Sequence, residues 1–304
     1  MEKRYPRTIL ATACVSWTGD YEFDETTFRR GVKLLLDNGI RSIYIFGTAG
    51  EGYAVSRGQF LEITAAFLDE MKKVPGAMPM VGVISLSMSE VIERIGLAMS
   101  LGANDFQISF PSWGAVSNNE AGVFLKTVCS RFPSARFMHY NNGLRSRTKL
   151  SVGDYKQLAE EIPNLAAVKL PGLDIRNLYK LHSQALPIEF YLCEFDYGFA
   201  SLGASVGYLV NLSSLNFKRA REYFDAGTRR DTDAIIAIHR DFETVVDTLL
   251  EYLPADRIDS AYDKLFVKYF LPDFSERLLP PYEGIEKEQF ERFAEEIRKR
   301  LPGW

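Results

Sequence analysis

The sequence predicts a (β/α)8 barrel, an α/β fold in which eight parallel strands alternate with helices. Short apolar runs alternate with stretches of helical spacing, and eight such strand–helix units follow one another at intervals of roughly 25–35 residues. A doubly wound open sheet is the alternative. It is disfavoured because no glycine-rich phosphate fingerprint follows the first predicted strand.

The predicted strands are short apolar runs bounded by turn residues or by the ends of helices. Their regular recurrence along the chain is what favours parallel strands joined by helical crossovers. The runs are Thr8–Val15, Ser42–Phe46, Met78–Ile84, Asp105–Ser109, Ala135–Tyr140, Leu165–Lys169, Ile188–Cys193 and Val206–Val210.

The segments between these runs carry apolar residues at the spacing of one helix face. Ser56 with Gln59 predicts a capping box at the start of one helix. Asn38-Gly39 and Leu101-Gly102 predict the ends of two others. Three stripes support these helices: Phe28, Val32, Leu35 and Leu36; Phe60, Ile63, Phe67 and Met71; and Val91, Ile95 and Ala98.

Helical patterns continue after the eighth predicted strand. We expect the barrel to occupy residues 1–226 and a helical extension, packed on it, to occupy 227–304. No Gly/Ser linker or low-complexity segment separates the two parts, and the extension shows no residues with evident chemistry. The predicted helices are Phe217–Ala226, Asp233–Tyr252, Ser260–Phe270 and Glu286–Leu301.

Composition excludes several classes of protein. The formal net charge is −4 at pH 7 and no basic block stands out, which argues against nucleic acid as a partner. The three cysteines, Cys14, Cys129 and Cys193, lie far apart without metal-ligand spacing, which favours a reducing compartment. The amino-terminal residues lack the apolar stretch of a signal peptide, and no run approaches membrane-spanning length. We therefore expect a cytoplasmic protein with no membrane partner and no metal site.

Lys169 is the leading candidate for chemistry because it closes the apolar run Leu165–Lys169. An ammonium group in such a place loses hydration, so we expect its pKa to fall toward neutrality. A neutral amine attacks carbonyl groups and gives a Schiff base. The alternative is a lysine that extends from the strand end into solvent.

Other polar motifs also end predicted strands. Tyr140 ends the run Ala135–Tyr140, and Gly47–Glu51 follows the run Ser42–Phe46. Pro111-Ser112-Trp113 follows the run Asp105–Ser109, and Cys193-Glu194 ends the run Ile188–Cys193. Active sites of (β/α)8 barrels lie at the carboxyl ends of the strands, so we expect these motifs to meet on the catalytic rim.

Several of these residues, in this order, resemble a known family. Gly47-Thr48-Ala49-Gly50-Glu51, Tyr140-Asn141 and Val168-Lys169 resemble the dihydrodipicolinate synthase / N-acetylneuraminate lyase family of class I aldolases, and the likeness extends to Gly203–Gly207 and Leu278–Pro281. The resemblance implies a (β/α)8 barrel that forms a homo-oligomer, a tetramer or a dimer. It also implies a lysine that forms a Schiff base with pyruvate or another 2-oxo acid, without a metal or organic cofactor.

The resemblance also implies roles for individual residues. Lys169 is the expected Schiff-base nucleophile, Tyr140 the proton shuttle, and Thr48 the hydroxyl that relays protons to Tyr140. The backbone N–H groups of Thr48 and Ala49 are expected to hold the carboxylate of the oxo acid. Glu194 is expected to face the second substrate. The further expected substrate contacts are Gly47, Trp113, Tyr208 and Arg145, with Arg147 as the alternative arginine.

The chain departs from the family pattern at three positions. Ala49 stands where a second hydroxyl residue is common, Asn142 where a proline is usual, and Trp113 where synthases supply a proton-relaying tyrosine to a neighbouring subunit. An indole cannot relay a proton as a phenol does, which disfavours a lysine-pathway synthase. Trp113 resembles instead the branch that hydrates and cleaves benzylidenepyruvates, and packing at a subunit interface is the alternative.

We therefore expect a lyase or aldolase that joins or separates a 2-oxo acid and an aldehyde. Two alternatives remain open at this point: a barrel that binds or senses 2-oxo acids without turnover, and a dehydratase or hydratase-aldolase acting on a sugar acid or a benzylidenepyruvate. The three histidines, His139, His182 and His239, are scattered and are expected to be structural. His139 in particular should point away from the barrel interior, because it alternates with Tyr140.

Overall fold

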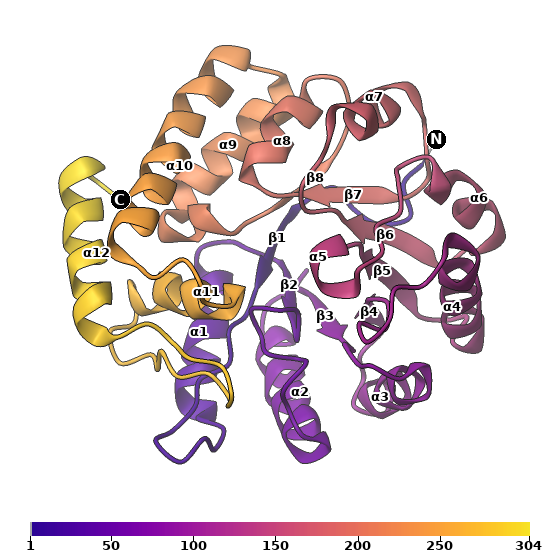
Figure 1. The fold of residues 1–304 in the computed structure, drawn as a ribbon, viewed down its shortest axis with the longest axis horizontal. Coiled ribbons are helices and arrows are strands. Elements are labelled where there is room, and N and C mark those ends of the chain that lie inside the picture. Colours follow the sequence, from indigo (N-terminus) through magenta and orange to yellow (C-terminus); the bar gives the residue numbers. More distant parts are fainter. Residues whose placement is uncertain (1) are drawn as a thin grey trace.

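The computed structural model describes residues 2–304, and its centre is a closed barrel of eight parallel strands (Figure 1). Each strand pairs with its neighbours in sequence, and the last strand closes the barrel by pairing with the first. This confirms the predicted (β/α)8 architecture. The strands are β1 (Ile9–Thr12), β2 (Ser42–Ile45), β3 (Met78–Gly82), β4 (Asp105–Ile108), β5 (Arg136–Tyr140), β6 (Leu165–Lys169), β7 (Glu189–Leu192) and β8 (Gly207–Leu209).

Helices follow the strands and surround the barrel. The predicted capping box is present, since the side chains of Ser56 and Gln59 each bond the backbone of the other residue. The helices are α1 (Glu25–Asp37), α2 (Arg57–Met71), α3 (Met88–Ser100), α4 (Asn118–Arg131), α5 (Gly143–Ser146), α6 (Asp154–Glu161), α7 (Ile175–Ser183), α8 (Glu194–Ser201), the 3-10 turn η1 (Leu212–Leu215), α9 (Phe217–Arg229), α10 (Thr232–Tyr252), α11 (Asp259–Lys268) and α12 (Lys287–Arg300).

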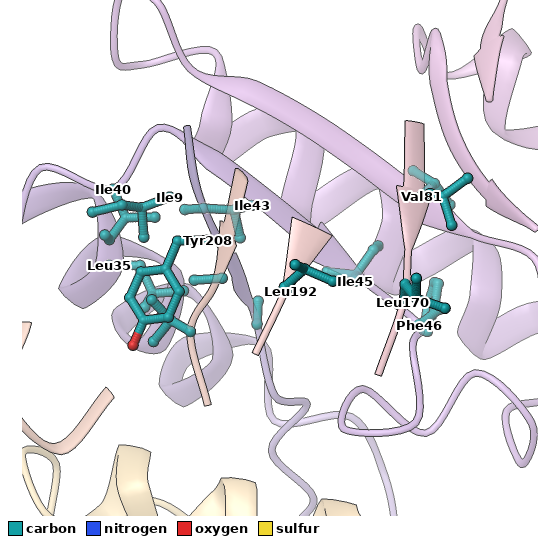
Figure 2. Close-up of a cluster of buried hydrophobic side chains, with 14 of the residues drawn as sticks. Ile9, Leu35, Ile40, Ile43, Ile45, Phe46, Val81, Leu170, Leu192 and Tyr208 are labelled. Atoms are coloured by element: carbon teal, nitrogen blue, oxygen red, sulfur yellow. The ribbon is translucent and has the colours of Figure 1, made fainter. Parts of the chain in front are cut away.

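The alternation of side chains along each strand divides the core into two layers. The inner layer fills the barrel and includes Leu10, Tyr44, Met138 and Leu209. The outer layer lies between the strands and the helices, and Figure 2 shows part of it, with Tyr208 beside its register neighbour Ile9. A residue therefore reaches the barrel interior only if it has the inward parity of its strand. This rule decides which predicted site residues can meet.

The amino end of the barrel interior is filled by the segment that precedes β1. Tyr5 is almost completely buried there and belongs to the inner layer. Arg136 lies over its ring and makes two hydrogen bonds to Asp105, of 2.8 and 2.7 Å. Lys3 donates a hydrogen bond to the backbone of Ile188. These contacts leave the carboxyl end as the open end of the barrel.

The extension after the barrel forms three helices, α10, α11 and α12, which gather on one side of the barrel in Figure 1. The helix α9 follows β8 as the eighth barrel helix and ends at Arg229 rather than at the predicted residue 226. None of the helices within residues 2–304 is long and apolar enough to cross a membrane.

Candidate active site

A cavity of about 540 Å³ opens at the carboxyl end of the barrel. It is walled by residues from the ends of the strands and by one helix of the carboxyl-terminal extension. We call it the active-site cavity. Its lining consists of Thr12, Tyr44, Thr48, Ala49, Tyr140, Asn142, Gly143, Leu144, Lys149, Lys169, Pro171, Gly172, Cys193, Leu209, Val210, Asn211, Asp259 and Asp263.

Lys169 projects from the end of β6 into this cavity and is only 6% exposed. Its Nζ donates a 2.8 Å hydrogen bond to the hydroxyl of Tyr44, on the opposite side of the barrel. The same Nζ lies 4.0 Å from the centroid of the Tyr140 ring and 4.6 Å from that of the Tyr44 ring. The amine therefore lies between two phenol rings and does not extend into solvent.

The expected fall in the pKa of Lys169 is wrong. Burial does lower this pKa, but the phenol groups of Tyr140 and Tyr44 act in the opposite direction, and the net shift is upward. Our expectation considered burial alone, whereas the hydrogen bond to Tyr44 and the two ring faces stabilise the ammonium form. Lys169 therefore holds its proton at neutral pH, and its attack on a carbonyl group requires a proton acceptor in the site.

Gly47 does not contribute a side chain to the cavity, but it sets the position of Tyr44. A methyl group at Gly47 would lie 2.6 Å from Cε2 of Tyr44, so only glycine lets the ring occupy its present place. Because the Tyr44 hydroxyl holds Lys169, Gly47 acts on the site through its neighbour.

Tyr140 lies at the end of β5, and its hydroxyl contacts two other polar side chains of the cavity. The Thr48 hydroxyl lies 3.4 Å away, and Asn142 Nδ2 donates to it at 2.8 Å. The side-chain oxygen of Asn142 also accepts from the backbone of Leu144 and Arg145, which fixes the start of α5. The residue that replaces the usual proline thus orients Tyr140.

Thr48 and Ala49 of the loop after β2 line the active-site cavity, and each has a backbone N–H group. Within residues 2–304 no group accepts a hydrogen bond from either of them. The methyl group of Ala49 packs with Cys14 and Phe274 and offers no hydroxyl to a ligand. This leaves two adjacent backbone donors near Lys169, an arrangement suited to an anion.

The loop after β2 is fixed by the carboxyl-terminal extension. Glu51 forms a fully buried ion pair with Lys264 of α11, with 2.6 Å between Oε1 and Nζ. It also accepts hydrogen bonds from the Trp17 indole at 2.8 Å and from the backbone of Leu279 at 2.7 Å. Ser260 of α11 donates to the backbone oxygen of Thr48 at 2.8 Å. The extension therefore holds the loop that carries Thr48 and Ala49.

The expectation that the extension shows no residues with evident chemistry overlooked α11, which places two carboxyl groups in the cavity wall. Asp259 pairs with Arg145 at 3.0 Å. Asp263 is only 6% exposed, and its Oδ1 accepts a 2.7 Å hydrogen bond from Nδ2 of Asn211. From the sequence alone, polar residues on a helix outside the barrel are expected to face solvent. The signal that was available is the repeated spacing of four, in Asp259 with Asp263 and in Ser260 with Lys264.

Two predicted substrate contacts lie outside the cavity. Glu194 is fully buried, and its Oε1 accepts hydrogen bonds from the backbone of Asn211 and from the backbone and hydroxyl of Ser213, so it fixes the turn after β8. Tyr208 belongs to the outer layer, where its hydroxyl lies 2.5 Å from that of Ser213. Alternation gives the inward position to its neighbour Leu209, which lines the cavity.

The other two predicted contacts lie at the edge of the site. Trp113 is 83% exposed and lines no part of the active-site cavity in the single chain. Arg145 lines a second cavity of about 170 Å³, which shares Thr48, Tyr140 and Asn142 with the first. Arg147 has a φ of 60° and is exposed, and it lines neither of these cavities. Of the two arginines, the structure places Arg145 near the site.

His139 has structural surroundings. His139 is buried between Phe110 and Tyr155, on the outer side of β5 as predicted, and its Nδ1 lies 2.7 Å from the Tyr155 hydroxyl. Burial lowers the pKa of His139 to about 3, which keeps the ring neutral. Across residues 2–304, no three His, Cys, Asp or Glu side chains gather as metal ligands.

Comparison with known proteins identifies the family. The model of the dihydrodipicolinate synthetase family matches residues 6–294. The chain belongs to this family. The match includes the strands of the barrel, the active-site cavity and most of the extension, so Lys169, Tyr140 and the loop after β2 all lie within it.

Individual relatives are distant. The chain is 24% identical over 173 residues to a 4-hydroxy-tetrahydrodipicolinate synthase of Salinibacter ruber, with 57% of this chain and 56% of the relative covered. It is 30% identical over 182 residues to a trans-O-hydroxybenzylidenepyruvate hydratase-aldolase of Sphingobium xenophagum, with 57% and 52% covered. The chain thus spans about half the length of these curated relatives. The crystal structure of CdNal from Clostridium difficile, in complex with mannosamine, shares the fold with a TM-score of 0.84 at 16% identity, over 97% of this chain and 99% of that one.

Proposed function

We propose that this protein is a Schiff-base-forming lyase or aldolase that acts on pyruvate or a related 2-oxo acid and joins it to, or separates it from, an aldehyde. The observation that carries the proposal is the placement of the Lys169 amine inside the cavity, between Tyr44 and Tyr140. A lysine held in this way attacks a carbonyl carbon once its proton has been removed.

Each further role is supported by a contact of the site. Tyr140, in contact with Thr48 and Asn142, donates and accepts protons as the carbinolamine on Lys169 loses water. The two backbone N–H groups of Thr48 and Ala49, which have no acceptor within the described chain, bind the carboxylate of the oxo acid. Arg145 at the rim attracts the acid toward the cavity, with Asp259 as its partner when the cavity is empty.

We also propose that the protein works as a homo-oligomer, a dimer or a tetramer. Trp113 and Leu144 are 83% and 81% exposed. Leu144 lies in α5 and lines the active-site cavity, and Trp113 follows Ser112, which lines the second cavity. Large apolar side chains exposed to this extent are typical of contact surfaces. This supports subunit packing as the role of Trp113. Light scattering after gel filtration measures the state, and a monomeric mass would contradict this proposal.

Borohydride trapping tests the reaction. The protein is incubated with pyruvate and sodium borohydride, and the adduct is measured by intact mass and located by peptide mapping. We expect one reduced adduct on Lys169. Lys169→Ala should give no adduct while its thermal unfolding stays close to that of the original protein.

Other outcomes change the proposal in defined ways. An adduct on Lys149, the other lysine of the cavity wall, would remove Lys169 from its role. An adduct with a longer oxo acid but not with pyruvate would mean that the cavity selects a larger acid. Binding of 2-oxo acids without an adduct or turnover would favour the sensor alternative.

A further inference from the structure

Asp263 is a carboxyl group of the active-site cavity to which the proposed reaction assigns no role. It comes from α11 and lines the cavity together with Lys169. Asn211 holds its Oδ1, whereas no group within residues 2–304 bonds its Oδ2. The second carboxyl group of the wall differs, because Asp259 is neutralised by Arg145. Of these two carboxyl groups, Asp259 has a hydrogen-bonded cationic partner and Asp263 does not.

Asp263 and Tyr140 approach the cavity from opposite sides. Asn211, which positions Asp263, follows β8, and Thr12 beside it ends β1. Tyr140 ends β5, which lies opposite β1 in a closed barrel of eight strands. Lys169 on β6 lies between these walls. A molecule tethered to Lys169 would therefore have a phenol on one side and a carboxyl group on the other.

A small cavity of about 30 Å³ also has Asp263 in its lining, together with Thr12, Cys14 and Ser214 among mostly apolar residues. The hydroxyl of Thr12 is buried and has no hydrogen-bond partner within the described chain, and Thr12 also lines the active-site cavity. A space of this size is large enough for one water molecule. Asp263 therefore lines both this small cavity and the active-site cavity.

The protonation of Asp263 suits proton transfer near neutral pH. Burial and the nearby Asp259 carboxylate raise the pKa of Asp263 to about 8, against the opposing effect of the Lys169 ammonium. Glu194 from α8 adds to the upward shift, and the hydrogen bond from Asn211 reduces it. A group of this kind both gives and takes a proton at working pH.

We propose that Asp263 is a catalytic residue that moves one proton between C3 of the Schiff-base-bound oxo acid and the oxygen on C4. This inference rests on the proposed function and assigns a second acid–base group to the same site. Tyr140 then exchanges protons with the oxygen that leaves C2, and Asp263 exchanges protons with C3 and with the oxygen on C4.

The proton balances in each direction. The carboxylate of Asp263 takes a proton from C3, and the electrons of the C3–H bond form the C2=C3 bond of the enamine while the iminium nitrogen becomes neutral. If C4 carries a hydroxyl group, Asp263 gives the same proton to that oxygen, the C4–O bond breaks and water leaves. The enamine electrons then form C3=C4 and restore the iminium. In aldol cleavage the carboxylate of Asp263 takes the proton of the C4 hydroxyl and the electrons of that O–H bond form C4=O. The electrons of the C3–C4 bond form the C2=C3 bond of the enamine, the iminium nitrogen becomes neutral and the aldehyde departs. Asp263 then gives the proton to C3, which restores the iminium.

Hydrogen–deuterium exchange at the methyl group of pyruvate tests this role, because exchange requires proton transfer at C3 but no second substrate. Exchange in D2O is followed by proton NMR for the original protein, for Asp263→Asn and for Asp256→Asn. Asp256 is an exposed carboxylate just before α11, paired with Arg257 outside the cavity. Borohydride trapping and thermal unfolding are measured on the same samples.

We expect Asp263→Asn to form the Lys169 adduct and to exchange about 10²–10⁴ times more slowly, the range for a positioned acid–base group, while Asp256→Asn behaves like the original protein. Exchange by Asp263→Asn at the original rate, with the adduct retained, would overturn the role of Asp263. So would an original protein that forms the adduct but does not exchange the methyl protons. An original protein without any adduct would instead refute the proposed function.

If Asp263→Asn does not fold, Asp263→Ala with added formate replaces it. Formate restores a carboxylate to the space left by the side chain, so we expect it to increase the exchange rate of Asp263→Ala at least about tenfold. Fast exchange by Asp263→Ala without formate would contradict the proposal.

Discussion

The two ends of the barrel interior contain similar residues in different surroundings. At the amino end, Glu189 on β7 is completely buried, and Lys3 lies 3.9 Å from its carboxylate. At the carboxyl end, Asp263 is buried in the wall of an open cavity that also contains Lys169. Burial raises the pKa of Glu189 to about 7, and burial with a neighbouring carboxylate raises the pKa of Asp263 to about 8.

The difference between these carboxyl groups lies in what can reach them. Tyr5 and the other residues before β1 fill the barrel interior at the amino end, so the raised pKa of Glu189 there is a cost of burial. Asp263 faces a cavity of about 540 Å³ that has room for a substrate. A perturbed pKa thus indicates a site only where a cavity and reactive neighbours accompany it.

Tyr140 and Tyr191, two of the inward-facing tyrosines, give the largest expected contrast. Tyr140→Phe should retain the pyruvate adduct but slow turnover by about 10²–10⁴, because a positioned acid–base group is lost. Tyr191→Phe, which removes a hydrogen bond to Pro6 at the amino end, should lower the stability by about 1 kcal/mol and leave turnover unchanged. Steady-state rates and denaturant unfolding measure both effects. An unchanged rate in Tyr140→Phe would remove Tyr140 from the mechanism.

The two lysine–carboxylate pairs come next. Lys264→Met should destabilise the protein by about 3–5 kcal/mol, because it leaves Glu51 buried without its cation. Lys3→Met should cost only about 1 kcal/mol, since Lys3 is partly exposed and its main contact is one hydrogen bond to Ile188. Chemical denaturation compares the two variants, and equal losses would show that the loop after β2 does not depend on the Glu51 pair.

The pH dependence of stability gives a smaller effect. The folded-state pKa values of Glu189 and Asp263, about 7 and about 8, lie above the unfolded values of about 4. Between the unfolded and folded pKa values the folded state binds more protons than the unfolded state. The stability that this proton binding contributes is therefore lost as the pH rises through about 7–8. Between pH 6 and 9, Asp263→Asn should weaken the decline in stability by up to about 2–3 kcal/mol, and Glu189→Gln by up to about 1 kcal/mol. Reduced pyruvate trapped on Lys169 should alter only the Asp263 contribution. Melting temperatures across this pH range test it, and a decline that persists in both variants would contradict the assignment.

Two glycine–tyrosine contacts give the smallest contrast. Gly47 packs on Tyr44, and Gly207 packs on Tyr191 at the other end, where an added methyl would lie 2.5 Å from the ring. Gly47→Ala should slow adduct formation by about 10-fold to 10²-fold, because Tyr44 must move away from Lys169. Gly207→Ala should lower stability without changing the rate of trapping. Trapping with pyruvate and borohydride, quenched at a series of times, measures the rate of adduct formation. Similar rates of adduct formation in Gly47→Ala and Gly207→Ala would mean that Tyr44 does not position the amine.

The sequence predicted all eight strands because short apolar runs recur at regular intervals and are separated by clear helix signals. It also pointed to Lys169, Tyr140 and Thr48, which lie together in the cavity. Tyr208 was misplaced because a shift of one residue along a strand exchanges the inner and outer faces. The apolar run around Tyr44 gave no sign of a polar function, since a tyrosine there reads as core.

Asp263 was not predicted, because its position in the cavity wall depends on tertiary packing. An amphipathic helix presents polar residues to solvent in the common case, and only the docking of α11 on the barrel mouth turns that face inward. Glu194 was misplaced for a related reason, since its side chain turns to the loop after β8 instead of toward the cavity.

The ion pair and hydrogen bonds of Glu51 also have a consequence for the order of folding. Glu51 and Leu279 are separated by 228 residues, and Lys264 lies in the same late part of the chain. During synthesis all eight strands leave the ribosome before these partners do, so a growing chain can close its barrel while the loop after β2 is still unanchored. The protein should therefore gain its catalytic competence in a final step, when the extension docks, and a chain stalled before α11 would be folded in large part and unable to react.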